Sequence, residues 1–211
     1  MILETRAVAP FHKNGFVVAC ERTREAVIID PGDEVNELLT AVDALKVHVK
    51  HILLTHAHLD HISGVDVAKQ AHSVPIHLHK DDLTLYQRAI QQGEMFGVTI
   101  RRQPPIDEFY NGTPIRFGDH EVLVHHTPGH CQGGVCLQMD RHLFVGDTLF
   151  AGSVGRSDLP GGNHDVLMRS IVDVLFPLGD DAIVHPGHGP DTTIARERAS
   201  NPFVLEYLGI R

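Results

Sequence analysis

The sequence of 211 residues lacks the features that mark membrane, secreted or disulfide-rich proteins. No apolar run approaches the roughly 18 residues needed to span a bilayer. The first residues, MILETRAVAP, carry an acid at position 4 and no basic start followed by an apolar stretch, so no signal peptide is predicted. The three cysteines, Cys20, Cys131 and Cys136, are odd in number and form no CxxC pair, which favours reduced thiols. We therefore expect a cytoplasmic protein.

Basic side chains are also few. Eighteen Lys and Arg stand against 27 Asp and Glu, for a net charge of −9. No basic cluster is larger than the pairs Arg22/Arg24 and Arg101/Arg102. Because nucleic-acid binding takes most of its affinity from cation–phosphate contacts, we expect neither a nucleic acid nor a membrane as partner, and the oligomeric state stays open. A metal centre would offset part of the negative charge.

The order of apolar patterns predicts a single α/β domain over residues 1–211, without linkers or repeats. The content of 42% hydrophobic and 21% charged residues is that of an ordinary globular chain. Predicted strands cover 16–20, 26–30, 47–55, 75–79, 113–126, 133–140, 142–150 and 182–189. Predicted helices cover 34–45, 65–72, 81–96, 164–176 and 193–200. This order favours strands sandwiched between outer helices.

The decapeptide THAHLDHISG, residues 55–64, concentrates possible metal ligands directly after a predicted strand. His56 and His58 are two residues apart, so an extended backbone would turn both side chains the same way. Asp60 and His61 follow the next turn and could face them across a shared cavity. The motif therefore predicts a metal site.

Three later strands also end at a possible ligand: HEVLVHHTPGH at His130, HLFVGD at Asp147 and DAIVHPGH at His188. Strand ends can converge on one edge of a sheet, where α/β folds place their sites. Seven candidates suffice for two divalent ions if Asp147 bridges them. Imidazole and carboxylate ligands favour zinc, with iron or manganese as alternatives.

The motifs THAHLDH, TPGH followed by CQGG, GDTLF and PGHG resemble, in order and spacing, the metallo-β-lactamase superfamily, and within it the glyoxalase II (hydroxyacylglutathione hydrolase) branch. The resemblance implies an α/β fold, the αβ/βα sandwich of two mixed β-sheets flanked by helices. It also implies the ligand sets. One ion would bind His56, His58 and His130, the other Asp60, His61 and His188, with Asp147 bridging and Asp60 positioning the metal-bound water.

Glyoxalase II enzymes carry a C-terminal helical domain that contacts glutathione, whereas only 23 residues follow His188 here. The resemblance is therefore greatest to the short, single-domain bacterial glyoxalase II-like hydrolases. It implies hydrolysis of small thioesters, such as S-lactoylglutathione, by a metal-bridging hydroxide. A thiol with a pKa of about 8.5 leaves as its thiolate without a strong general acid. A metal-dependent hydrolysis of this kind agrees with the absence of a G-x-S-x-G nucleophile motif from the sequence.

Two other functions stay open. GRSDLPGG, residues 155–162, bears some likeness to the loop of persulfide dioxygenases, mononuclear iron enzymes of the same fold that use two histidines and one aspartate. Asp60 and His61 would then bind no metal. A binding module that uses the fold as a scaffold is less favoured, because converging His and Asp side chains are costly to bury unpaired.

The remaining polar residues have less specific predictions. Arg156 could face a carboxylate of the substrate or form a loop salt bridge. Asp30 could bond a metal-bound group, bond the backbone of the ligand motif, or only form the turn before Pro31. Cys131 is expected to be small and partly buried rather than catalytic, and His185 to orient His188. Structural roles are expected for His48, His51, His77, His79, His125 and His126.

Overall fold

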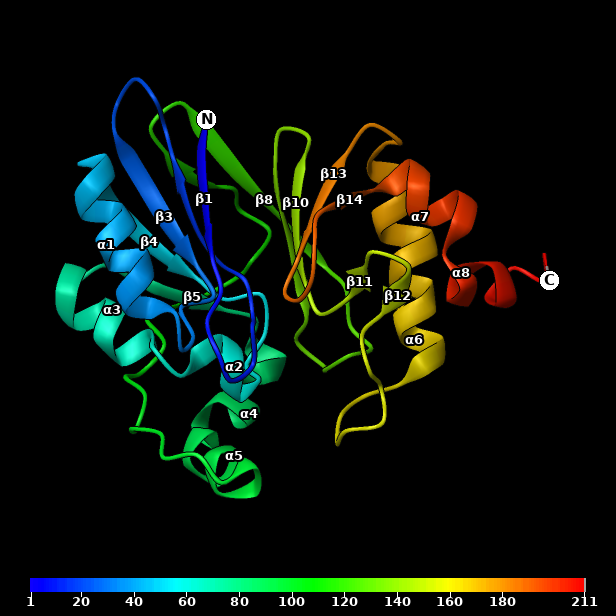
Figure 1. Cartoon of the computed structure of the whole chain (residues 1–211), viewed down its shortest axis with the longest axis horizontal. Helices are drawn as coiled ribbons and strands as arrows, with labels where there is room; N and C mark the ends of the chain where they lie inside the picture. Colours follow the sequence, from blue (N-terminus) through cyan, green and yellow to red (C-terminus); the bar gives the residue numbers. More distant parts are fainter. Residues whose placement is uncertain (211) are drawn as a thin grey trace. The chain divides into compact units, whose positions relative to one another are not determined.

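The computed structural model describes residues 1–210, and the chain divides into two compact units, residues 1–121 and a second unit that begins at Val122. Figure 1 follows the chain from the blue N-terminus to the red C-terminus. The prediction of one hydrolase domain stays a prediction. Within residues 1–210, no helix combines the length and apolar character that a membrane span requires.

The first unit is built on a six-stranded mixed sheet in the order β1-β2-β3-β4-β5-β6. The strands are β1 (Ile2–Arg6), β2 (Gly15–Ala19), β3 (Glu25–Ile29), β4 (His48–Leu53), β5 (Ile76–Leu78) and β6 (Glu108–Phe109). The first three pair antiparallel, and β3 to β6 pair parallel. Parallel pairing brings the carboxyl ends of β3 and β4 to one edge of the sheet, and the metal motif begins there.

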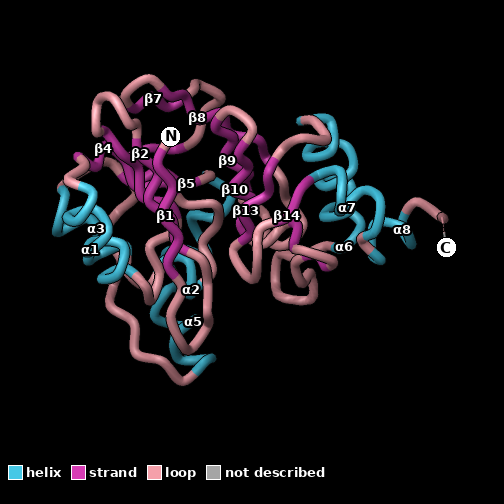
Figure 2. Tube along the Cα trace, turned by 45° about the horizontal axis from the view of Figure 1, so that its top comes forward, coloured by secondary structure: helices cyan, strands magenta, loops and turns pink. Residues whose placement is uncertain are grey.

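The helices of this unit are α1 (Val35–Leu45), α2 (Leu59–Ile62), α3 (Val65–His72), the 3₁₀ turn η1 (Lys80–Asp82), α4 (Leu83–Gln87) and α5 (Ala89–Phe96). Helix α1 buries Leu38, Ala41 and Val42, spaced for one helix face, against apolar residues of β2 and β3. Figure 2 shows α1 and α3 next to one another beside the strands labelled β2 and β4.

The prediction of one helix over 81–96 is wrong. The chain leaves helical geometry at Arg88, where φ is −92° and ψ is 20°, and α5 starts at Ala89 as a separate helix. The reason is tertiary, because Gln92 on α5 bonds to the carbonyl of Leu85 on α4 and to the loop at residues 57–59. Periodicity alone does not reveal such a break.

A second six-stranded mixed sheet has the order β14-β13-β10-β9-β8-β7. Its strands are β7 (Ile115–Phe117), β8 (His120–His126), β9 (Val135–Met139), β10 (His142–Gly146), β13 (Ile183–Pro186) and β14 (Thr192–Thr193). The predicted strand 113–126 is divided by a turn, in which Gly118 has a φ of 55°. A small hairpin, β11 (Leu149–Phe150) and β12 (Ser153–Val154), follows β10.

The helices of the second unit are α6 (His164–Arg169), which runs on through the π-helical η2 (Ser170–Leu175) and the 3₁₀ η3 (Phe176–Leu178), then α7 (Ile194–Ser200) and α8 (Pro202–Tyr207). Leu167 and Ile171 of this long helix pack with Val145 and Val184 of the sheet. Two mixed β-sheets flanked by helices, as predicted from the sequence, are therefore confirmed.

Candidate metal centre

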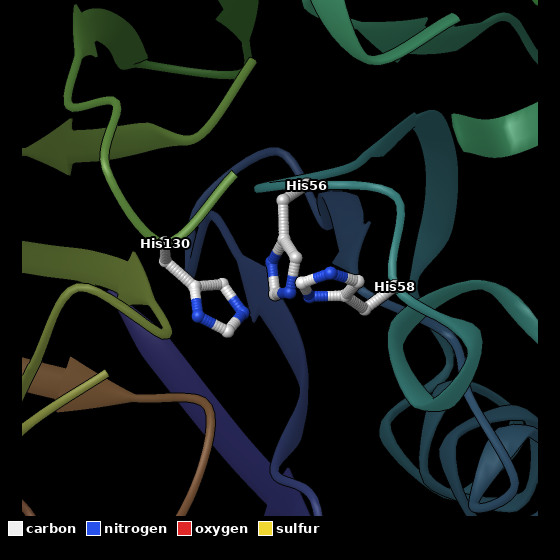
Figure 3. A group of neighbouring side chains, drawn as sticks. All are labelled: His56, His58 and His130. Atoms are coloured by element: carbon white, nitrogen blue, oxygen red, sulfur yellow. The ribbon is translucent and has the colours of Figure 1, made fainter. Parts of the chain in front are cut away.

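The predicted ligands of the first unit lie together on the loop after β4 and on α2. The ring centroids of His56 and His58 are 4.9 Å apart, and those of His56 and His61 are 4.0 Å apart. Figure 3 shows the first of these pairs, His56 and His58, with both rings carried by the loop between β4 and α2, residues 54–58, which we call the ligand loop. Asp60 Oδ2 lies 3.8 Å from Nε2 of His61. The four side chains of the motif thus form one group, in which His56 and His61 are buried.

Asp30, which follows the last residue of β3, forms contacts with this group of side chains and with the adjacent Thr55. It is 1% exposed, and its carboxylate accepts hydrogen bonds from the Thr55 amide at 2.7 Å and the Thr55 hydroxyl at 2.5 Å. The same carboxylate lies 2.8 Å from Nδ1 of His61. A ligand histidine held this way keeps Nε2 for a metal. Asp30 therefore contacts both a candidate ligand and the backbone of the ligand loop.

Asp30 also lies close to both buried histidines of the motif. Asp30, His56 and His61 each offer one ligand atom, and these atoms are within 4.8 Å of one another. Thr55 Oγ1 lies 3.1 Å from Nδ1 of His56, so the Asp30–Thr55 pair also bears on that ring. Two imidazoles oriented through Nδ1 present the donor set that divalent transition metals prefer.

A buried ion pair fixes the turn that carries Asp30. Lys13 Nζ lies 2.5 Å from Glu34 Oε1, both side chains are 1% exposed, and the ammonium group also donates to the Asp30 carbonyl. Glu34 Oε1 accepts from the Gly32 amide at 3.0 Å. A Cβ on Gly32 would lie 1.8 Å from the Asp60 carbonyl oxygen, so this turn packs directly on α2.

Two side chains beyond the motif hold Ala57, the residue between the first two ligands. Asp82 accepts from the Ala57 amide at 2.9 Å. Gln92 accepts from the Leu59 amide at 2.9 Å and donates to the Ala57 carbonyl at 3.0 Å. Asp82 and Gln92 are 1% and 8% exposed. The sequence did not predict the roles of Asp82 and Gln92, or of Lys13 and Glu34. No spacing rule connects these four residues to the motif.

In the second unit, Asp147 stands between two histidines. Nε2 of His130 and Nε2 of His188 each lie 3.6 Å from the same oxygen, Oδ2 of Asp147. These separations are too long for hydrogen bonds. Ligand atoms bound at about 2.0–2.2 Å to a common ion are separated by roughly 3–3.6 Å, so both pairs have the spacing of atoms that share a metal. The predicted bridging position of Asp147 fits this arrangement.

The loop after β12 supports this half of the centre. The Arg156 carbonyl oxygen is 2.7 Å from Nδ1 of His130, which leaves Nε2 toward Asp147. A Cβ on Gly155 would lie 1.8 Å from the Asp147 carbonyl oxygen, so only glycine lets the loop approach this closely. The Arg156 guanidinium forms two 2.8 Å hydrogen bonds with exposed Asp158 and lowers the pKa of that carboxyl to about 2. A role of Arg156 toward substrate stays a prediction.

Other histidines form pairs across neighbouring parallel strands. His51 Nδ1 is 3.0 Å from His77 Nε2, and His142 Nδ1 is 2.9 Å from His185 Nε2. Burial lowers the pKa of His77 to about 4. His185 also lies 3.0 Å from Asp191, and its predicted effect on His188 stays a prediction.

Three of the remaining histidines with expected structural roles have side-chain contacts within the protein. His125 lies 2.7 Å from Gln138 Oε1, His126 lies 2.9 Å from the Gln132 carbonyl oxygen, and His79 accepts from the Asp81 amide, while His48 is exposed. Cys131 was expected to be partly buried and is 2% exposed, so its burial is more complete than predicted.

Comparison with known proteins places this arrangement in a family. The chain is 42% identical to an uncharacterized protein of Aquifex aeolicus over 99% of both chains. It is 35% identical to the hydroxyacylglutathione hydrolase GloC of Haemophilus influenzae, over 97% of this chain and 98% of the relative.

Solved structures agree. BLEG-1 B3 metallo-β-lactamase has a TM-score of 0.89 at 36% identity, over 96% of this chain and 99% of that one. TTHA1623 in a di-iron-bound form has a TM-score of 0.84 at 37% identity, over 95% and 99%. ETHE1 from Myxococcus xanthus has a TM-score of 0.79 at 28% identity, over 96% and 84%. Residues 9–188 match the family described as the metallo-β-lactamase superfamily. The chain therefore belongs to the metallo-β-lactamase superfamily and has its fold.

Proposed function

We propose that the protein is a dinuclear metal-dependent hydrolase of small thioesters of the hydroxyacylglutathione type. The observation that carries this proposal is the position of Asp147 Oδ2, 3.6 Å from Nε2 of both His130 and His188, which suits a carboxylate shared by two ions. The 35% identity to the hydroxyacylglutathione hydrolase GloC, over nearly the full length of both chains, supports the glyoxalase II branch and the substrate class.

The proposed ligand sets follow the family motif. One ion would be held by His56, His58 and His130, the other by Asp60, His61 and His188, and both by Asp147. Zinc suits this donor set, and the di-iron form of TTHA1623 supports iron as an alternative. When bound, the ions lower the pKa of water and polarise the thioester carbonyl.

Groups of the protein would orient the ligand histidines and the attacking water. Asp30 keeps Nδ1 of His61 occupied, and the Arg156 carbonyl does the same for His130, so each ring presents Nε2. Asp60 is partly exposed beside His61 and can accept a hydrogen bond from the attacking water. Water adds to the carbonyl carbon, the carbon–sulfur bond breaks, and the products are a carboxylic acid and a thiol. The thiol has a pKa of about 8.5, so its thiolate leaves readily and no buried general acid is needed.

A persulfide dioxygenase is the second candidate. The likeness of residues 155–162 to the loop of that branch and the 28% identity to ETHE1 favour it. As a persulfide dioxygenase, the protein would hold one iron with two histidines and one aspartate. The number of metal ions per chain and the substrate both distinguish it from the thioesterase.

The test is a substrate panel with the metal-loaded protein: S-lactoylglutathione, other acyl-glutathiones, and thioesters of other thiols. We expect hydrolysis of at least one acyl-glutathione, and loss of that activity in His58→Ala and Asp147→Asn. His48→Gln, a change of an exposed histidine outside the motif, should retain it. Failure to hydrolyse every thioester would refute the proposal. Oxygen uptake with glutathione persulfide at one iron per chain would establish the second candidate instead.

A further inference from the structure

The first unit contains a cavity of about 820 Å³ between α4, α5 and residues 102–109. This volume is within the roughly 300–1,000 Å³ typical of small-molecule sites. Its walls are mainly apolar: Leu83, Tyr86, Ile90, Pro104, Ile106 and Phe109. None of the seven candidate metal ligands lines it, so the cavity is a separate feature of the unit.

The polar groups of the cavity differ in whether they already form hydrogen bonds within the protein. Gln103 accepts from the Asp66 amide and donates to the Arg101 carbonyl, both at 3.0 Å. The Tyr86 hydroxyl donates to the Pro104 carbonyl at 2.9 Å, and burial raises the pKa of the phenol. These groups stabilise the wall and have little capacity left for a ligand.

Arg102 is different. It is exposed at the cavity, and within residues 1–210 its guanidinium has no carboxylate at ion-pair distance, whereas neighbouring Arg101 lies 3.7 Å from Asp66. In a chain of net charge −9, a cation without an acid beside an apolar cavity leaves a positive site. A guanidinium binds carboxylates and sulfonates through paired N–H donors, and the walls favour an apolar body.

We propose that this cavity binds a small organic anion with an aromatic or branched aliphatic body and one anionic group, with Arg102 contacting the anion. Ile90 and Phe109, which line the cavity and are 43% and 41% exposed, supply apolar contact surface for this body. This binding goes beyond the proposed hydrolysis and does not depend on it.

The experiment uses two fluorescent probes with the full-length, metal-containing protein. 8-Anilinonaphthalene-1-sulfonate carries the anion, and N-phenyl-1-naphthylamine has the same aromatic body without it. We expect saturable sulfonate binding at one site, weakened about tenfold in Arg102→Gln, with the affinity for the neutral probe unchanged within about twofold. Arg88→Gln, which makes the same charge change at an exposed arginine outside the cavity lining, should bind both probes like the parent protein.

A second variant tests the apolar wall. Ile90→Gln should weaken both probes, whereas Leu123→Gln, at an equally exposed residue outside the cavity lining, should weaken neither. Thermal unfolding confirms that each variant is folded. The proposal is overturned if no saturable sulfonate site exists, if Arg102→Gln and Arg88→Gln bind the sulfonate equally, or if Ile90→Gln leaves both affinities unchanged. The assay contains no thioester, so its failure is separate from failure of the proposed hydrolase function.

Discussion

Replacing Asp30 by Asn tests how the fold prepares His61 for a metal. Three donors meet the Asp30 carboxylate: the Thr55 amide, the Thr55 hydroxyl and the ring of His61. An asparagine of nearly the same shape would accept two of these bonds and turn an N–H₂ group toward the third position. Where that group faces His61, Nδ1 becomes the acceptor and the ring proton moves to Nε2, the atom needed by the metal.

The magnitude follows from the bonds lost. Loss of a supporting contact to a ligand histidine lowers metal affinity by about 10–100-fold, or about 1.4–2.7 kcal/mol. Hydrogen bonds to a buried charged group contribute about 1.5–3 kcal/mol each, so the metal-free protein should also unfold more easily. Competition with a chelating dye measures the first effect, and urea unfolding in excess chelator measures the second.

Asp33→Asn is the matched control, because exposed Asp33 lies in the same turn and accepts a hydrogen bond from the Ser63 hydroxyl at 2.6 Å. We expect this control to bind metal like the parent protein. Equal metal affinity in Asp30→Asn and Asp33→Asn would refute the role assigned to Asp30.

Further predictions concern the other supports of the centre. Gln92→Leu leaves the Leu59 amide and the carbonyls of Ala57 and Leu85 without their partner, which should cost about 1–3 kcal/mol and speed metal release; release at the parent rate in a stopped-flow chelator assay would exclude this role. Gly155→Ala should lower both the melting temperature and the metal affinity, because its Cβ meets the Asp147 carbonyl, and normal values of both would count against the close approach. Lys13→Met leaves Glu34 as an uncompensated buried charge and should cost about 3–5 kcal/mol in urea unfolding at pH 7; a loss below about 1 kcal/mol would contradict the burial of the pair. His77 has a pKa of about 4 against 6.5 in an unfolded chain, so the unfolded state takes up the proton first as pH falls. Stability should therefore be full above pH 6.5 and fall by about 3 kcal/mol toward pH 4, and a His77→Gln variant with the same pH dependence as the parent would disprove this.

Local patterns predicted the parts of this protein that depend on short stretches of chain. The apolar runs located β2, β3, β4 and β5, and helical spacing located α1 and α3 within a residue or two. The short strands β1, β6 and β14 escaped prediction because sheet neighbours, rather than strong local patterns, stabilise them. The break at Arg88 escaped for the same reason, since Gln92 makes its bonds across the fold.

The candidate ligands were predictable because each follows a strand in a short motif. The groups that orient these ligands were not predictable from the sequence. The Arg156 carbonyl that holds His130 is a backbone group that any residue could supply. Lys13 and Glu34 are 21 residues apart, and nothing in their spacing indicates a buried pair. Asp30 was recognisable as a candidate because it ends a strand, but its bond to His61 depends on the parallel pairing of β3 and β4.

The most direct test of the proposed dinuclear centre is the number of ions bound per chain. Metal-free protein would be reloaded with zinc or with iron, freed of excess ion, and measured by elemental analysis against protein concentration, in the parent chain and in Asp60→Asn, His61→Gln and Asp147→Asn. We predict two ions per chain in the parent, about one in the Asp60 and His61 variants, and weakened binding of both in Asp147→Asn. One ion per chain in the parent, unchanged in Asp60→Asn and His61→Gln, would contradict the account.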